Sequence, residues 1–386
     1  MKKNLKIFVI AGESSGDILA ADLMNALLKK NKNISFFGVG GEEMKKVGAF
    51  KSLFNISDIA VMGFSEIIKN IFKIKKRINQ TVDEILRVQP DVVVTVDAPG
   101  FNMAVVKKVR ASGKLSDTKF VHYVAPQVWA WKEKRAEKIA KIFDYLLCFF
   151  PFEPKYFERY GLKCFVVGHT AIKNVIGDRE RFLKNYNLSK NDVILTLLPG
   201  SRKQMAERLL PIYRDVVDEL YNKIPNLKVV IPVTETIDYY IFSETKSWKY
   251  EPIIIKGKQN RYDAFMASRA SLCISGTAVL ELSVAKVPTV VAYKISKLSY
   301  AIAKHFVKIK NVTLPNIIMG KTIVPEFIQD KCNVKNLVNA LVKAITDAKY
   351  RESQKKNYDK LLEKMNFGDK KTPSDKGADA ILSIIK

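Results

Sequence analysis

Short apolar runs alternate with longer stretches of helical periodicity from one end of the chain to the other. This alternation is typical of parallel sheets with crossover helices, because strands that are buried on both faces are continuously apolar. The first half predicts strands at Leu5–Ile10, Ile34–Val39, Val92–Val96, Phe120–Val124, Tyr145–Phe149 and Cys164–Val167. The second half predicts strands at Val193–Leu198, Lys228–Pro232, Pro252–Ile255, Ser271–Ser275 and Pro288–Tyr293. We therefore expect two α/β domains.

The domain boundaries are predicted from places where the periodicity weakens. The segment from Gly168 to Lys190 is polar, charged and weakly periodic, so the connection between the domains is expected there. A chain of 386 residues with 47% hydrophobic content is too long for one typical domain and apolar enough for two cores. We expect domains at 1–170 and 171–350, followed by C-terminal helices at 351–386.

The charge of the chain indicates the kind of surroundings it meets. A formal net charge of +26 favours a polyanionic neighbourhood, such as nucleic acid, an anionic membrane face or phosphorylated substrates. A lysine-rich proteome is the alternative explanation for most of the lysines. No apolar stretch approaches the roughly 20 residues that span a bilayer, and the apolar run near Met1 is too short for a signal peptide. We expect a cytoplasmic protein whose membrane contact, if it has one, is peripheral.

The turn Ala11–Asp17 follows the first predicted strand and precedes a helix. Its small residues Gly12, Ser14 and Ser15 let a ligand approach the backbone and the helix N-terminus, and Glu13 lies among them. The turn is not a G-x-G-x-x-G sequence, so it only weakly favours a dinucleotide. Ordinary helix capping by Ser and Asp is the alternative.

The segment Pro90–Asn102 reads as a buried strand that ends in the carboxylate of Asp97. Ligands of open α/β sheets gather at the carboxyl ends of strands, where a carboxylate can act as a general base. The alternative is that Asp97 only caps the following helix.

A further loop after a predicted strand contains Gln127, Trp129 and Trp131. Aromatic faces beside polar donors suit a sugar or an apolar chain, and packing of both Trp side chains in the core is the competing interpretation.

The second half repeats the design of strand, small residues and helix twice. Leu197–Gln204 contains Gly200, Ser201 and Arg202, which together predict an anion site for a pyrophosphate. Ile274–Glu281 adds a second such turn at the same sheet edge, formed by Ser275, Gly276 and Thr277. Glu281 lies one turn into its helix, where a carboxylate can accept hydrogen bonds from ribose hydroxyls. The two turns together predict a nucleotide-diphosphate site.

The sequence does not favour a metal site. The three histidines, His122, His169 and His305, do not fall at ligand spacings, and no Asp-x-Asp occurs. Metal-dependent sugar transferases of the single-domain type commonly hold their ion with such a pair. We therefore expect a two-domain transferase with no metal and no other cofactor, in which a cationic side chain and helix N-termini stabilise the leaving diphosphate.

The segment 63–78 predicts a basic amphipathic helix. Its apolar residues recur at i, i+3 and i+4 spacing, and they are Phe64, Ile67, Ile68, Ile71, Phe72 and Ile78. Its cations fall mainly on the opposite side, and they are Lys69, Lys73, Lys76 and Arg77. Such a helix can lie in an anionic membrane surface. The alternative is that the apolar face packs on the sheet of the first domain.

A series of stretches resembles the lipid-A-disaccharide synthase family, in the same order along the chain. They are Ala11–Asp17, Gly38–Gly41, Met62–Phe64, Asp97–Asn102, Val124–Trp131, Phe150–Glu153, Val167–Thr170, Leu198–Arg202, Ser275–Thr277 and Leu314–Asn316. This collinearity is far more specific than any single motif. The resemblance implies two facing Rossmann-like domains of the GT-B type, with C-terminal helices that return to the first domain.

The resemblance also implies a reaction. UDP-2,3-diacylglucosamine would donate its sugar to 2,3-diacylglucosamine 1-phosphate, with inversion, to give a β-1′,6-linked disaccharide and UDP. Asp97 is implied to be the base that activates the acceptor hydroxyl. Arg202, Glu281 and Asn316 are implied to bind the donor, with Arg202 on the diphosphate. The implied partners are the inner-membrane surface, where the protein would lie peripherally, and a second copy that exchanges C-terminal parts.

Two alternatives remain from the sequence. Another two-domain UDP-sugar enzyme, such as a UDP-sugar epimerase or a transferase acting on a cell-wall lipid, shares the same motifs of strand, turn and helix. A nucleic-acid-binding protein is suggested by charge alone, but its basic residues would cluster with exposed aromatic residues on one domain, whereas the lysines here are spread along the full length.

Overall fold

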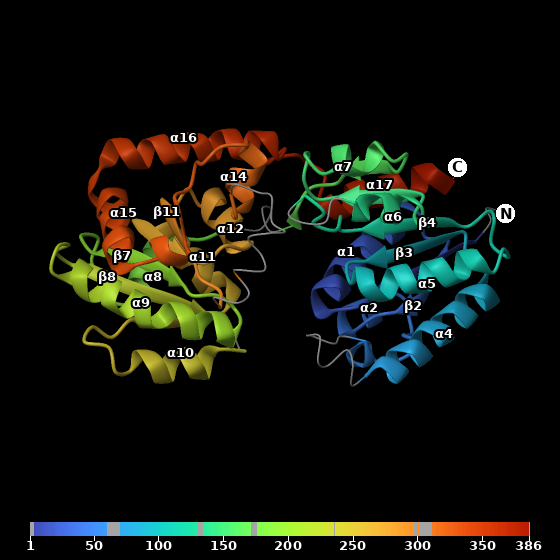
Figure 1. Ribbon diagram of the computed structural model, residues 1–386, viewed down its shortest axis with the longest axis horizontal. Coiled ribbons are helices and arrows are strands. Elements are labelled where there is room, and N and C mark those ends of the chain that lie inside the picture. The colour runs from blue at the N-terminus through green and yellow to red at the C-terminus, as the bar shows by residue number, and fades with distance from the viewer. Residues whose placement is uncertain are drawn as a thin grey trace. The chain divides into compact units, whose positions relative to one another are not determined.

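The computed structural model describes residues 4–59, 70–129, 134–170, 176–234, 236–296, 300 and 311–385. The chain divides into two compact units (Figure 1). The first unit comprises Met1–His169 together with Asp369–Lys386, and the second comprises Thr170–Gly368. The change of unit after His169 lies one residue before the first boundary that we expected from the sequence.

The first unit is built on a six-stranded parallel sheet with the strand order β2-β1-β3-β4-β5-β6. Its strands are β1 (Leu5–Ala11), β2 (Ile34–Val39), β3 (Val92–Val96), β4 (Lys119–Tyr123), β5 (Tyr145–Cys148) and β6 (Lys163–Val166). All residues of β3 are buried, and four of the five are valine, which suits a strand with helices on both faces of its sheet.

Helices cover this sheet and complete its core. They are α1 (Ser14–Lys30), α2 (Glu42–Lys45), the short 3₁₀ turn η1 (Ile56–Asp58), α4 (Ile71–Val88), α5 (Pro99–Ala111), α6 (Arg135–Ala140), α7 (Pro154–Glu158) and α17 (Pro373–Ile385). Phe8 of β1 and Val93 of β3 share one apolar cluster with Ile85 of α4 and Val105 of α5. The helices α1 and α17 pack against each other.

The second unit carries a second six-stranded parallel sheet, with the order β12-β11-β10-β7-β8-β9. Its strands are β7 (Val193–Leu198), β8 (Leu227–Val233), β9 (Ile253–Lys256), β10 (Ala270–Cys273), β11 (Thr289–Tyr293) and β12 (Glu326–Ile328). Its helices are α8 (Arg179–Asn185), α9 (Lys203–Tyr221), α10 (Asp238–Thr245), α11 (Lys258–Ala267), α12 (Ala278–Val284), α14 (Leu314–Met319), η3 (Gln329–Lys331), α15 (Val334–Thr346) and α16 (Ala348–Lys364).

The C-terminal helices are divided between the two units, which corrects the expected assignment of 351–386 to the first domain. α16 packs on α12, α14 and α15 of the second unit. There the side chain of Gln354 both accepts from the N–H of Thr289 at 3.0 Å and donates to its carbonyl at 3.1 Å. Only α17 packs on the first unit, where Asp379 pairs with Lys30 at 2.8 Å. The sequence pattern shows that α16 has a face to bury, but it does not show which sheet that face meets.

Each sheet has one position where the direction of strand order reverses. β1 lies between β2 and β3, and β7 lies between β8 and β10, so the chain adds strands first on one side and then on the other. In open α/β folds, ligands bind outside the carboxyl ends of the strands at such a reversal. Ligand sites are therefore expected at these two edges.

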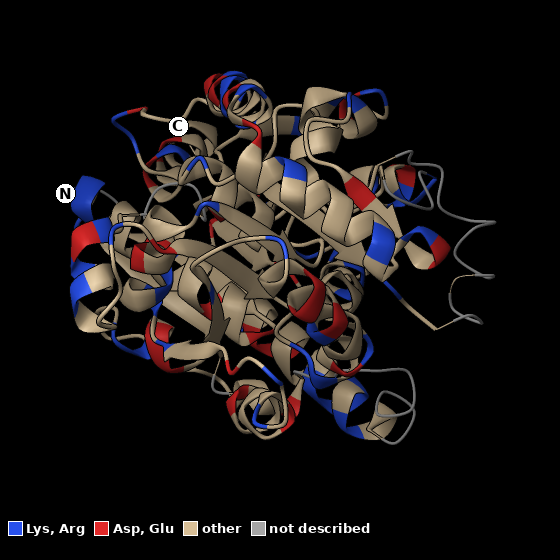
Figure 2. Ribbon diagram, turned by 90° about the vertical axis from the view of Figure 1, so that its left-hand side faces the viewer, with Lys and Arg blue, Asp and Glu red and all other residues tan. Residues whose placement is uncertain are grey.

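The surface carries charges of both signs. In Figure 2, Asp and Glu residues stand among the Lys and Arg residues of the helices in view. Ion pairs between residues one helical turn apart join Lys45 to Glu42 and Lys141 to Glu137. Mixed charge of this kind differs from the basic stripe typical of nucleic-acid-binding proteins. Across the described residues, none of the helices has the length and apolar character needed to span a bilayer.

Candidate active site

Asp97 follows β3 at the carboxyl edge of the first sheet, beside the reversal of strand order. Its N–H donates to the carbonyl of Tyr123 in β4 at 3.0 Å, so the residue is still tied to the sheet. The backbone then turns sharply, because Asp97 and Ala98 both adopt the left-handed conformation, with φ of 48° and 40°. The helix α5 begins directly afterwards at Pro99, a residue whose fixed φ suits a first helical position.

The carboxyl group of Asp97 is half-buried. Burial raises its pKa above the ordinary value, and the N–H of Ala98 lowers it in part. A raised pKa makes the carboxylate a stronger base. Asp97 therefore has the position and the chemistry of a general base.

The first turn of the chain lies against the turn of Asp97. Gly12 is buried, and a Cβ added to it would lie 2.3 Å from the Cβ of Ala98, so the two turns approach this closely only with glycine at residue 12. Ser14 and Ser15 are exposed, and Glu13 is half-buried. The structure thus brings the two sequence-predicted turns of the first unit together at one edge.

The predicted residues in the loop after β4 differ in their exposure to solvent. Gln127 is exposed, whereas Trp129 is buried, 8% exposed, and packs edge-on against Phe152 at 5.4 Å. This arrangement favours the interpretation in which Trp129 packs in the core over direct contact with a ligand. Trp131 lies outside the described residues.

A buried carboxyl group near this loop was missed by the sequence analysis. Glu153 is 2% exposed, and its Oε2 accepts the N–H of Phe150 at 2.9 Å. Burial raises the pKa of Glu153 to about 7. The rings of Phe150 and His169 stack at 5.4 Å, and burial lowers the pKa of His169 to about 4. The resemblance includes Phe150–Glu153, and this was the signal available in the sequence.

The second unit places its two predicted turns side by side. β7 pairs with β10, with Leu198 opposite Cys273, so the turns that follow these strands lie at one carboxyl edge. Gly200 has a φ of 110°, and Arg202 is the exposed N-cap residue of the 19-residue helix α9. The N–H groups of a first helical turn lack intrahelical partners, so this edge offers hydrogen-bond donors beside a guanidinium group. It is a suitable site for a phosphate.

The second turn is tied to a neighbouring loop and is partly open. The hydroxyl of Ser275 donates to the carbonyl of Val312 at 2.7 Å, whereas Gly276 and Thr277 are exposed. Glu281 in α12 is 8% exposed. Its Oε1 accepts from Nη2 of Arg261 at 2.9 Å, and burial raises the pKa of this carboxyl group.

Asn316 is fully buried and its side chain is saturated by hydrogen bonds within the protein. Its Nδ2 donates to the carbonyl of Val324 at 2.8 Å and to Oε1 of Glu326 at 2.7 Å. Its Oδ1 accepts the N–H groups of Ile323 and Val324 at 2.7 and 2.9 Å. These contacts give Asn316 a bracing role, and its implied role as a donor ligand stays a prediction.

Glu326 extends this brace to the loop that Ser275 contacts. Its carboxylate accepts the N–H of Val312 at 3.0 Å and the N–H of Thr313 at 2.8 Å. Nothing in the sequence singled out Glu326, because its partners lie ten or more residues away. Within the described part of the chain, no group of three or more His, Cys, Asp or Glu residues is placed to hold a metal ion.

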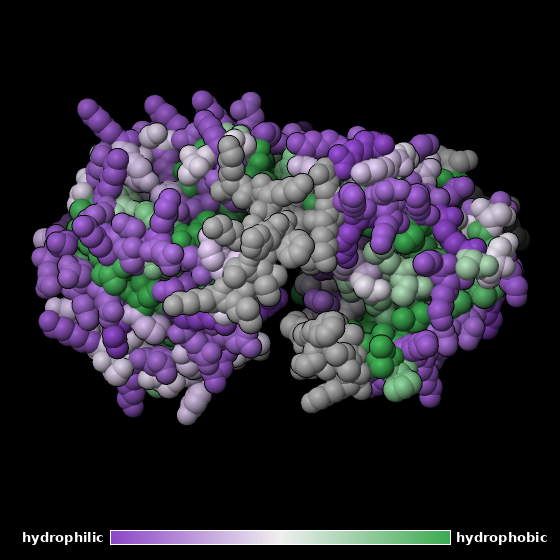
Figure 3. Space-filling view, in the orientation of Figure 1, coloured by the Kyte–Doolittle hydropathy of each residue, from purple (hydrophilic) through white to green (hydrophobic). Residues whose placement is uncertain are grey.

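The helix α4 presents the described part of the predicted amphipathic surface. Phe72 is 85% exposed and Ile71 is 50% exposed, whereas Val82, Ile85 and Val88 of the second half are buried. Figure 3 shows apolar side chains on the surface over the first turns of this helix. Phe64, Ile67, Ile68 and Lys69 lie outside the described residues. Ile78 is half-buried and packs against the core.

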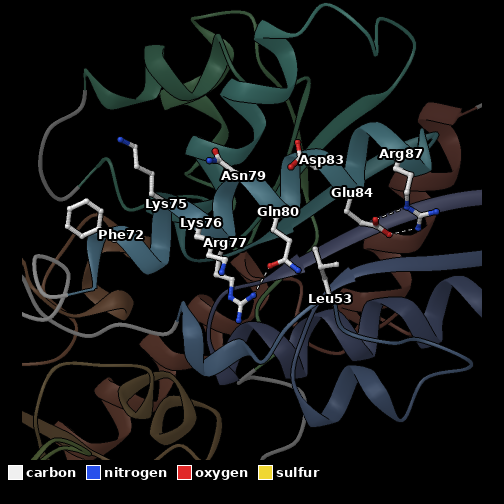
Figure 4. A pocket seen from close by; sticks show the side chains of 10 residues that line it. All are labelled: Leu53, Phe72, Lys75, Lys76, Arg77, Asn79, Gln80, Asp83, Glu84 and Arg87. Carbon is white, nitrogen blue, oxygen red and sulfur yellow. Dashed lines mark hydrogen bonds and ion pairs between the residues drawn. The ribbon is translucent and has the colours of Figure 1, made fainter.

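Two of the predicted cations of α4 pair with one carboxylate. Lys73 pairs with Asp58 at 2.6 Å, and Nε of Arg77 donates to the same carboxylate at 2.9 Å. Lys76 is exposed, and so is Lys75, a residue absent from the predicted set. A groove of about 890 Å³ runs along this helix. Figure 4 shows the side chains that line it, which are Leu53, Phe72, Lys75, Lys76, Arg77, Asn79, Gln80, Asp83, Glu84 and Arg87.

Comparison with known proteins identifies the family. A model of the lipid-A-disaccharide synthetase family matches residues 7–378. The lipid-A-disaccharide synthase of Rhodospirillum centenum is 38% identical over 386 residues, which cover 99% of this chain and 95% of that protein.

Solved structures share the fold at much lower identity. The UDP-GlcNAc 2-epimerase of Neisseria meningitidis, bound to UDP-GlcNAc, matches with a TM-score of 0.63 at 13% identity and covers 99% of each chain. MurG of Acinetobacter baumannii matches with a TM-score of 0.58 at 13% identity, covering 98% of this chain and 99% of that chain. Together with the two parallel sheets, these matches confirm the predicted GT-B fold.

Proposed function

The chain belongs to the lipid-A-disaccharide synthase family and is a glycosyltransferase, and we propose that it joins UDP-2,3-diacylglucosamine to 2,3-diacylglucosamine 1-phosphate. The products are the β-1′,6-linked lipid A disaccharide 1-phosphate and UDP. The observation that carries this proposal is that polar side chains suited to sugar transfer lie at the two positions where the strand order reverses. Asp97 lies at the reversal in the first sheet. Arg202 lies at the reversal in the second sheet, beside the turns that follow β7 and β10.

In the proposed reaction, Asp97 removes the proton of the acceptor hydroxyl as its oxygen attacks the anomeric carbon of the donor. The bond from that carbon to the diphosphate oxygen breaks on the opposite face, so the configuration inverts. The electron pair leaves with UDP. Positive charge from Arg202 and the N–H groups of the first turn of α9 stabilises the leaving diphosphate. Glu281 is assigned to the ribose, for which it would have to share its contact with Arg261.

We propose that this enzyme needs no metal ion, because a guanidinium group and helix N–H groups supply the positive charge at the diphosphate. The measurement is turnover with and without EDTA. Unchanged turnover is expected, and a large loss that added Mg²⁺ restores would overturn this part of the proposal.

The reaction is tested by incubating the purified protein with the UDP-sugar, with and without the acceptor lipid. Disaccharide 1-phosphate and UDP should form only when both substrates are present. A change of the UDP-sugar without acceptor would instead indicate an epimerase.

Asp97→Asn should fold and bind UDP but transfer sugar roughly 10²- to 10⁴-fold more slowly, because an amide cannot take the proton. Arg202→Ala should lose UDP affinity and turnover, and a folded variant with wild-type turnover would remove Arg202 from the diphosphate site.

We further propose that the protein lies peripherally on the inner membrane and that α4 contributes to the contact. The exposed Ile71 and Phe72 next to Lys75 and Lys76 support this, since apolar side chains flanked by cations suit an anionic lipid surface.

Dimerisation by exchange of the C-terminal part is a second proposal. The contact between α1 and α17 could form equally between two copies, and sedimentation at several concentrations measures it.

A further inference from the structure

Asn102 is a fully buried residue one turn into α5 that binds three consecutive carbonyl groups. Its backbone N–H donates to the carbonyl of Ala98 at 3.2 Å. Its side-chain Nδ2 donates to the carbonyl of Asp97 at 2.7 Å and to that of Val96 at 3.3 Å. A single residue therefore holds both the end of β3 and the turn that follows it.

The conformation of this turn is unfavourable without support. Asp97 and Ala98 have φ of 48° and 40°, where the Cβ of an L-residue crowds its own backbone. Two successive left-handed residues other than glycine persist only where the surrounding structure imposes them. The Asp97 N–H is fixed by the carbonyl of Tyr123, and Gly12 packs closely on Ala98. The remaining side of the Asp97 peptide, its carbonyl, is fixed by Asn102.

The side-chain amide of Asn102 donates hydrogen bonds but accepts none among the described residues. Its Oδ1 is buried and finds no hydrogen-bond donor among the described residues. An unpaired buried acceptor lowers stability, so this side chain is not the best choice for stability alone. A flipped amide would place that oxygen against two carbonyl oxygens, which fixes the orientation of the group. The two N–H groups, both directed at the turn, are what this position supplies.

We propose that Asn102 is a positioning residue for sugar transfer, because its amide fixes the turn of Asp97 and Ala98 and thereby the direction in which Asp97 presents its carboxylate to the acceptor. The inference rests on the proposed role of Asp97 as the base. Asn102 acts through the peptide of Asp97. With both the N–H and the carbonyl of Asp97 bound, the direction of its Cα–Cβ bond is fixed before the acceptor arrives.

The test replaces Asn102 by Ala and, as a graded variant that keeps one donor, by Ser. For Asn102→Ala we expect kcat to fall roughly 10²-fold, as for a catalytic group displaced by about 1 Å, and for Asn102→Ser we expect a smaller loss. The KM for the UDP-sugar and the Kd for UDP should not change, because that site belongs to the second unit. The acid limb of the pH profile of kcat should move to lower pH, since a loosened turn exposes the carboxylate of Asp97 and removes the burial that raises its pKa.

Asn357→Ala is the matched control, because the Asn357 side chain also donates to a carbonyl, that of Ser353 at 3.0 Å, but on the exposed side of α16. It should change neither kcat nor the pH profile. A folded Asn102→Ala with wild-type kcat and acid limb would refute the positioning role. So would a parallel fall of kcat, UDP affinity and Tm, which a merely structural residue would give. If the alanine variant does not fold, the same readouts on Asn102→Ser decide.

Asp97→Asn, measured in parallel, separates this inference from the proposed function. An inactive Asp97→Asn beside a wild-type-like Asn102→Ala rejects only the positioning role. An active Asp97→Asn rejects Asp97 as the base, and the positioning role falls with it.

Discussion

At the scale of single residues, Glu153 shows how a buried acid makes stability depend on pH. Its pKa is raised to about 7 by burial, from an ordinary value of 4.5. Between these two pH values the folded protein keeps a proton that the unfolded chain has already released. Folding is therefore favoured below this window and loses stability as pH rises through it, by about 1.4 kcal/mol per pH unit for this one group.

Replacing Glu153 by Gln should remove this dependence. The amide oxygen of Gln can still accept the N–H of Phe150, but the group no longer titrates. We expect the Tm of Glu153→Gln minus that of the wild type to become more positive between pH 5 and pH 8, because the titrations that both proteins share cancel in the difference. The exposed Glu219→Gln serves as the control and should show no such trend. A Tm difference that is equal at both pH values would contradict the raised pKa of Glu153.

The residues of the site divide into those that a sequence shows and those that it does not. Asp97 directly follows an apolar run, and Arg202 lies four residues beyond the end of another, so their location at a sheet edge could be predicted from local pattern alone. Asn102 and Glu326 act through hydrogen bonds whose value depends on the folded backbone, such as the left-handed turn at Asp97. The buried bracing by Asn316 was missed for the same reason, since its partners are set by the path of the loop that follows α14.

At the scale of elements, α4 combines two environments in one helix. Its second half buries Val82, Ile85 and Val88, whereas its first half exposes Ile71 and Phe72. Periodicity revealed the apolar face of this helix but not where along it the core ends. Burial by the neighbouring α5 and β2 decides that, and it depends on tertiary contacts. The three-residue strand β12 went unpredicted because so short a run carries no periodicity.

The exposed half of α4 gives a test of membrane contact. The double variant Ile71→Ser and Phe72→Ser should bind vesicles containing anionic phospholipid at least about tenfold more weakly, because each buried apolar side chain contributes on the order of 1.5–3 kcal/mol. Its Tm should barely change, since both side chains are exposed in the folded chain. Co-sedimentation with vesicles and thermal unfolding are the measurements.

The helix α10 offers a matched control for that experiment. Tyr239 and Phe242 are 83% and 52% exposed, and Asp238 lies beside them at the start of the helix. Tyr239→Ser with Phe242→Ser removes a similar exposed apolar area from a helix that presents no exposed cluster of cations. Vesicle binding should be unaffected. Equal losses for both double variants, or a sharp fall in Tm for the α4 variant, would contradict a specific contact through α4.

At the scale of the whole molecule, each unit has its own sheet and its own reversal of strand order, and the chain enters the first unit twice. Two α/β domains could be predicted from the sequence because their strands repeat the same pattern. That α17 alone of these two helices packs on the first unit could not be predicted, because α16 and α17 both carry apolar faces. Residues distant in the sequence decide which sheet each helix covers. Gln354 commits α16 to β11, and Asp379 pairs α17 with Lys30 of α1.

Because α17 packs on the first unit, we expect the stability of that unit, and not of the second, to depend on the C-terminal helix. Ile381 is fully buried, and Ile381→Ala should lower the unfolding free energy of the first unit by roughly 2–5 kcal/mol, the usual cost of a cavity in a core. Hydrogen exchange should rise in α1 and β4, which α17 contacts, while the second unit keeps its protection and its UDP affinity. The half-buried Ile384→Ala should have a smaller effect. Exchange that rises in the second unit instead, or UDP affinity that falls in step with stability, would show that α17 supports more than the unit on which it packs.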